Sequence, residues 1–161
     1  MNTFGSILVP VDLGGSTERI LRTAGELAEA MDASVSVLHV VQPMPLLPLA
    51  AGDEQMAPQT AKGFNIPVYQ KTIEDRARSA MEELVGRTIP GERVAALQVR
   101  TGTVGTSILD ECRSGDYDLV IMDSGEDHLL TKLFGSVTDK VVKNAPVPVL
   151  VLRGPKQEEE E

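Results

Sequence analysis

Two short apolar runs near the C-terminal end restrict the fold of this chain most strongly. Residues 119–122 and 147–152 both run without a charged residue. Runs of this length are typical of parallel strands that are covered on both faces of a sheet. Between them stands Gly135-Ser136, a flexible residue followed by a preferred helix cap, which predicts a short helix over 136–144. A helix that begins at the carboxyl end of a parallel strand presents free N–H groups, so this segment also predicts an anion site.

The rest of the chain repeats this alternation of strand and helix. Apolar and β-branched residues dominate three further strand segments, at 4–11, 34–41 and 93–100. Apolar residues at helical spacing predict helices between the turn at 13–16 and Asp32, over 68–87, and over 104–113. The alternation predicts a three-layer α/β/α domain with a five-stranded parallel sheet and right-handed crossovers.

Each of these three predicted helices has one apolar face that we expect to be buried. In the first helix this face comprises Ile20, Leu21, Ala24, Leu27, Ala28 and Met31. In the second it comprises Ile73, Ala77, Ala80, Met81, Leu84 and Val85. In the third it comprises Val104, Ile108, Leu109 and Cys112, so Cys112 is expected to be an inert packing residue.

Length and composition predict a single domain over residues 1–153. The 161 residues are 42% hydrophobic, enough for a sizeable core, and no run reaches the roughly 18 apolar residues of a membrane helix. One cysteine cannot form an internal disulfide and suits a reducing compartment, so we expect a cytoplasmic protein without membrane insertion. A net charge of −9 with 3% aromatic residues argues against nucleic-acid binding. Residues 154–161 are predicted to be an acidic disordered tail.

Residues 42–67 differ in composition from the rest of the domain. Five prolines lie among small residues, at Pro43, Pro45, Pro48, Pro58 and Pro67. Prolines at this density oppose a regular helix or a central strand, so we expect a partly ordered insert. A long insert in a compact domain usually has a purpose, which makes this one a candidate surface for a protein partner.

Three segments together resemble the universal stress protein family (UspA-like domains) over about residues 3–153. The first two match the family's first and second strands: Ile7-Leu8-Val9-Pro10-Val11-Asp12 and Val37-Leu38-His39-Val40-Val41. The third matches its C-terminal third: residues 118–122, then Gly135-Ser136-Val137-Thr138-Asp139-Lys140-Val141-Val142, then 145–151. The resemblance implies an adenine nucleotide alpha-hydrolase-like (Rossmann-like) fold with strand order 3-2-1-4-5 and a crevice between strands one and four. It also implies homodimers that pair through the strand at 147–152, where Pro148 suits an edge position.

The resemblance also implies a nucleotide-binding pattern after the fourth strand. Family members that bind ATP have a glycine, two residues, a second glycine, nine residues, and then Gly-Ser or Gly-Thr. In this chain the first glycine position is Asp123 and the second is Glu126, with a spacer one residue short and with Gly125 displaced by one position. Only Gly135-Ser136 matches.

These replacements predict that tight ATP binding is lost. Two carboxylates would stand where a multiply charged anion must approach, and like charges about 4 Å apart in a partly desolvated cleft repel by a few kcal/mol. The adenosine half of the crevice is better preserved, so AMP or weakly bound ATP is an alternative ligand. The candidate crevice comprises Pro10, Val11, Asp12, Val40, Val41, Asp123, Ser124, Gly125, Gly135, Ser136, Val137 and Thr138.

Other polar residues have both a functional and a structural interpretation. Asp12 and Asp123 end strands one and four, so they are candidates for ribose contacts or a metal pair, or they cap the turns that follow. His39 lies inside a strand, where a hydrogen-bonded structural role is the usual one, and His128 lies in a polar loop. Neither has partners at metal-ligand spacing, so no metal site is predicted.

The sequence therefore predicts a non-catalytic, dimeric stress-response or regulatory module with a degenerate phosphate loop. Two alternatives stay open: an ATP- or AMP-binding sensor with slow or no hydrolysis, and a soluble regulatory domain of a membrane transporter.

Overall fold

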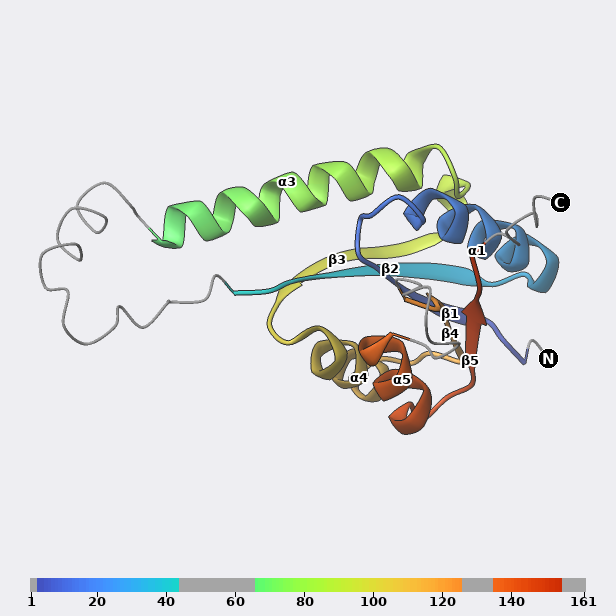
Figure 1. The fold of residues 1–161 in the computed structure, drawn as a ribbon. Coiled ribbons are helices and arrows are strands. Elements are labelled where there is room, and N and C mark those ends of the chain that lie inside the picture. The colour runs from blue at the N-terminus through green and yellow to red at the C-terminus, as the bar shows by residue number, and fades with distance from the viewer. Residues whose placement is uncertain (1–2, 44–65, 126–134, 155–161) are drawn as a thin grey trace, which may run out of the picture.

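The computed structural model describes residues 3–43, 66–125 and 135–154. Its centre is a five-stranded sheet in which all pairings are parallel and the order is β3-β2-β1-β4-β5 (Figure 1). The strands are β1 (Ser6–Val11), β2 (Ser34–Val41), β3 (Val94–Thr101), β4 (Leu119–Asp123) and β5 (Val149–Leu152). The helices are α1 (Thr17–Met31), α3 (Ile66–Gly86), α4 (Val104–Ser114) and α5 (Ser136–Asn144), with a 3-10 turn at Gly91–Arg93. The predicted fold class and strand order are confirmed.

Helices cover both faces of the sheet, as Figure 1 shows: α1 and α3 lie on one side, and α4 and α5 on the other. The alternation of side chains along each strand separates two hydrophobic clusters. In β2, Val35 and Val37 face the α1 and α3 side, while Leu38 and Val40 face the α4 and α5 side. Both β1 and β4 are almost wholly buried, as continuous apolar strands of a parallel sheet must be.

The boundary between α3 and the Pro-rich insert differs from our expectation. We expected the prolines to exclude a helix through Pro67, but α3 begins at Ile66 and contains Pro67 in its first turn. Proline is tolerated there because the first N–H groups of a helix have no intrahelical acceptor. Residues 44–65 of the insert lie outside the described part, as does the acidic tail beyond residue 154.

Two further details correct the prediction. Ala80 is exposed rather than buried, because α3 presents only a narrow stripe to the sheet through Ala77, Met81 and Val85. Strand β5 begins at Val149 instead of 147, although the carbonyl of Pro148 still accepts a 2.9 Å bond from the Val120 N–H. No helix within the described ranges is long and apolar enough to cross a membrane.

Candidate functional site

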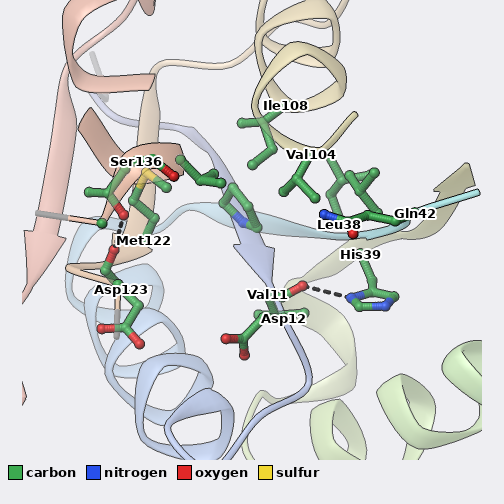
Figure 2. A pocket seen from close by; sticks show the side chains of 16 residues that line it. Val11, Asp12, Leu38, His39, Gln42, Val104, Ile108, Met122, Asp123 and Ser136 are labelled. Atoms are coloured by element: carbon green, nitrogen blue, oxygen red, sulfur yellow. Dashed lines mark hydrogen bonds between the residues drawn. The ribbon is translucent and has the colours of Figure 1, made fainter. Parts of the chain in front are cut away.

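The sheet order reverses between β1 and β4, and a cavity opens at their carboxyl ends (Figure 2). Its volume is about 630 Å³, within the range of small-molecule sites. The walls come from the ends of β1, β2 and β4 and from the first turns of α4 and α5. Open α/β sheets bind ligands at such a switch point, because the loops on its two sides diverge there.

One wall of the cavity is apolar. Residues of β2, β4, α4 and α5 supply it: Leu38, Val40, Met122, Val104, Ile108 and Val137. Val104 and Ile108 lie one turn apart on α4, and Figure 2 shows their side chains on the same side of the cavity. This wall suits a flat, mostly apolar group such as a nucleobase.

A second part of the cavity lining consists of two glycines and the N-terminus of α5. Gly125 has φ +93, and a Cβ there would lie 2.8 Å from the backbone N and Cα of Gly135. Gly135 donates its N–H to the Ser124 carbonyl at 2.9 Å and occupies the N-cap position of α5, where no side chain caps the helix. The first N–H groups of α5 and the Ser136 hydroxyl are therefore available at the place where an anion is favoured.

This geometry adds a second way to align the glycine pattern. We assigned the second glycine position to Glu126, but Gly125 is the residue that packs against Gly135. The nine residues 126–134 separate these two glycines, which is the implied spacer, so the missing residue lies between Asp123 and Gly125. Glu126 itself lies outside the described residues. Gly125 and Gly135 therefore fit two of the three glycine positions that the resemblance implies, and Asp123 stands at the remaining one.

Asp123 connects three elements at this end of the cavity. Its carbonyl accepts a 2.7 Å bond from Thr138 Oγ1 in the first turn of α5. Its carboxylate Oδ2 accepts a 2.6 Å bond from Ser16 Oγ, in the turn before α1. Figure 2 shows that the side chains of Asp12 and Asp123 point the same way, away from Val104 and Ile108.

The carboxylate of Asp12 fixes the turn that follows β1. Its Oδ1 accepts bonds from the Gly14 N–H at 2.7 Å and from Thr17 Oγ1 at 3.2 Å. The intervening Leu13 has φ 62, a conformation that costs a non-glycine residue on the order of 1 kcal/mol. The structural interpretation of Asp12 as a turn cap is therefore correct, and a ribose contact stays a prediction.

His39 also lines the cavity and is tied to its neighbouring strand. Its Nδ1 lies 2.8 Å from the Val11 carbonyl oxygen, and since a carbonyl only accepts, Nδ1 carries the proton. This agrees with the hydrogen-bonded role that the sequence predicts for His39, whereas His128 lies outside the described residues. In the described part of the chain, no group of three or more His, Cys, Asp or Glu side chains could hold a metal ion.

The cavity gathers all but two of the predicted site residues. The two that do not line it are Val41 and Ser124. Val41 points to the opposite face of the sheet from Val40, because side chains alternate along β2. Ser124 contributes its backbone, which bonds to Gly135 and Leu152. Sequence reasoning missed six lining residues: Leu38, His39, Gln42, Val104, Ile108 and Met122. Alternation along the strand from Val40 would have identified Leu38. The one-turn spacing of Val104 and Ile108 predicted a shared helix face but not that this face lines the cavity.

The fold, with a cavity where the strand order reverses, defines an α/β protein of the doubly wound, Rossmann-like class. Residues 3–153 match the model of the Universal stress protein family, and the chain belongs to this family. It is 29% identical over 150 residues to Universal stress protein A homolog 1 of Coxiella burnetii, with 91% of this chain and 94% of that protein covered.

Solved structures share the fold. The hypothetical protein MJ0577 superposes with a TM-score of 0.70 at 20% identity, covering 96% of this chain and 99% of its own. A universal stress protein in complex with cAMP superposes with a TM-score of 0.59 at 18% identity, covering 93% of this chain and 97% of its own. That universal stress protein therefore binds a nucleotide.

Proposed function

We propose that this protein is a non-catalytic regulatory module that binds an adenine nucleotide with a single phosphate, and that it holds ATP only weakly. One observation carries this proposal: the cavity joins an apolar wall to the N-terminus of α5, which no side chain caps and which lies beside the close pair Gly125 and Gly135. The apolar wall accommodates the base, and the N-terminus of α5 with the Ser136 hydroxyl accommodates one phosphate. The relative with bound cAMP, a ligand with one phosphate, supports this choice.

The charge of the cavity disfavours additional phosphates. Its described lining contains two carboxylates, Asp12 and Asp123, and neither Lys nor Arg. A helix N-terminus contributes about half a positive charge, which suits one phosphate better than a triphosphate with about four negative charges. We therefore expect ATP to bind about tenfold or more weakly than AMP in the absence of a metal ion.

The titratable side chains of the described lining support a non-catalytic function. Asp12 is bonded within its turn, Asp123 to Ser16, and His39 to the Val11 carbonyl. A carboxylate that accepts hydrogen bonds from protein donors is a weaker general base than a free one, because these bonds stabilise its charged form. We expect no phosphate release above background when ATP and Mg²⁺ are incubated with the protein and followed by ³¹P NMR.

Calorimetric titration with adenosine, AMP and ATP tests the proposed ligand. AMP should bind, and at about 100 times its Kd it should raise the unfolding free energy by about 2.7 kcal/mol. The absence of binding and of any thermal shift with millimolar AMP would contradict the proposal. Equal or tighter binding of ATP, with or without Mg²⁺, would favour the second candidate, an ATP sensor, which the nine-residue spacing between Gly125 and Gly135 supports.

We further propose that the module acts as a homodimer paired through β5. This strand is an edge of the sheet, and exposed apolar side chains flank it, Leu150 on the strand at 37% exposure and Val142 on α5 at 41%. An apolar edge strand favours pairing with a second chain. A protein partner for residues 42–67 and a link to a membrane transporter stay predictions, because residues 44–65 lie outside the described part.

A further inference from the structure

The N-cap hydroxyl of α1 is directed away from its own helix. Ser16 occupies the N-cap position, and serine there usually accepts a bond from the first turn. In this protein the Ser16 side chain makes no capping bond, and its hydroxyl donates instead to the carboxylate of Asp123, 107 positions away in the sequence. The 2.6 Å distance is typical of a short bond to a charged acceptor.

This bond is the shorter of the two that hold the negative charge of Asp123, since Ser124 Oγ also donates to Oδ1 of Asp123 at 3.4 Å. We call the part of the cavity formed by Gly125, Gly135 and the first turn of α5 the phosphate end. The Asp123 backbone is held there, because its carbonyl accepts a hydrogen bond from the Thr138 hydroxyl of α5. Its carboxylate is held by Ser16 in the turn before α1. Figure 2 shows the Asp123 side chain pointing away from Ser136. There it lies at the N-terminus of α1, where the helix dipole also favours an anion.

We propose that Ser16 is a positioning residue that keeps the Asp123 carboxylate away from the phosphate end and so permits a phosphate-bearing ligand to bind. This inference rests on the proposed function and adds the device that makes it compatible with an acidic residue in the phosphate loop. Without the Ser16 hydroxyl, rotation about the Asp123 side-chain bonds brings the carboxylate toward the first turn of α5. A negative charge there repels the phosphate and leaves the nucleoside unaffected.

Four variants and two ligands separate this role from a structural one. Ser16→Ala should weaken AMP binding about five- to tenfold and leave adenosine binding unchanged, as measured by calorimetry. Ser16→Thr keeps a hydroxyl and should restore AMP binding. Asp123→Asn should bind AMP at least as tightly as the parent protein. In the Ser16→Ala/Asp123→Asn double variant, AMP binding should not fall, because the charge that Ser16 restrains is gone.

Three results would overturn the inference while leaving the proposed function intact. In the first, Ser16→Ala binds AMP as the parent does. In the second, Ser16→Ala loses AMP and adenosine to the same extent. In the third, the double variant loses AMP as much as Ser16→Ala alone. If the parent protein binds neither ligand, the proposed function fails and this inference fails with it. Adenosine affinity reports whether the cavity of each variant is intact, so a folding defect is recognised separately.

Discussion

Tyr117 donates a 2.6 Å hydrogen bond from its hydroxyl to Oε1 of Glu111, a carboxylate in the interior of the protein. Glu111 lies on α4 with 4% of its surface exposed. Gln98 donates to the same oxygen at 3.0 Å, and Arg100 pairs with the second oxygen, so two residues of β3 are joined to α4. A buried carboxylate with this set of donors fixes the helix that supplies Val104 and Ile108 to the cavity.

The first prediction concerns alkaline pH. Burial and the bond to Glu111 raise the pKa of Tyr117 from 10.0 to about 12. In the unfolded chain the phenol therefore loses its proton first, so stability is complete below about pH 10 and falls as the pH rises toward 12. Urea unfolding between pH 9 and 12 should show this loss in the parent protein, and Tyr117→Phe should lack that part of it. A phenolate absorbance difference between the two proteins with a midpoint near 10 would contradict the prediction.

The second prediction concerns Glu111 itself. Glu111→Ala leaves Tyr117, Gln98 and Arg100 without their shared acceptor, which should lower the unfolding free energy by about 2–4 kcal/mol. Asp110→Ala is the matched control, because Asp110 is exposed on the same helix and meets Arg113 only at 3.9 Å. The control should change stability by no more than about 0.5 kcal/mol. Equal effects of the two changes in urea unfolding would show that the buried network does not stabilise the fold.

The third prediction concerns the contact between α1 and the end of α3. A Cβ on Gly25 would lie 2.9 Å from the backbone oxygen of Thr88, so Gly25→Ala forces two backbone segments apart. It should cost about 1–3 kcal/mol of unfolding free energy. Gly86→Ala, at the end of α3, meets nothing within 4 Å and should be neutral or stabilising by up to about 1 kcal/mol. Thermal and urea unfolding of both variants compare the two sites directly. An unchanged unfolding free energy for Gly25→Ala would contradict the prediction, because it would mean that the two backbone segments move apart without loss of stability.

The fourth prediction concerns the proposed dimer. Leu150→Lys places a charge on edge strand β5 and should shift the protein to monomers in analytical ultracentrifugation. Ala95→Lys places the same charge at an exposed position of β3, the opposite edge of the sheet, and should leave the assembly unchanged. If the parent protein is monomeric at high concentration, or if only the β3 change dissociates it, β5 is not the interface.

Much of the fold could be predicted because its signals are local. The β-branched run of β2 and the Gly135-Ser136 start of α5 gave the bounds that the structure shows. The observed ends of β1, β3 and β5 differ from the predicted ends by one or two residues. Pairing with a neighbouring strand, rather than apolar character, decides where a strand begins.

The site was less predictable because its key contacts are distant in sequence. Nothing near Ser16 indicates that its hydroxyl bonds to Asp123, since Ser16 reads as an ordinary helix cap. Gly125 was predicted as a site residue, but its close approach to Gly135 was not, because the register of two loop residues is decided only in the folded chain. The residue type at Asp123 predicted a carboxylate that repels phosphate. The direction in which this carboxylate points is decided only when the chain folds.

The central position of β1 has a consequence for how this molecule folds. It must pair with β2, some thirty positions away, and with β4, more than a hundred positions away. Closing the larger loop costs more chain entropy, so β1 and β2 are expected to associate early and β4 late. The cavity exists only after the late event, so a ligand bound there would join the first and last thirds of the polypeptide and would stabilise the whole domain.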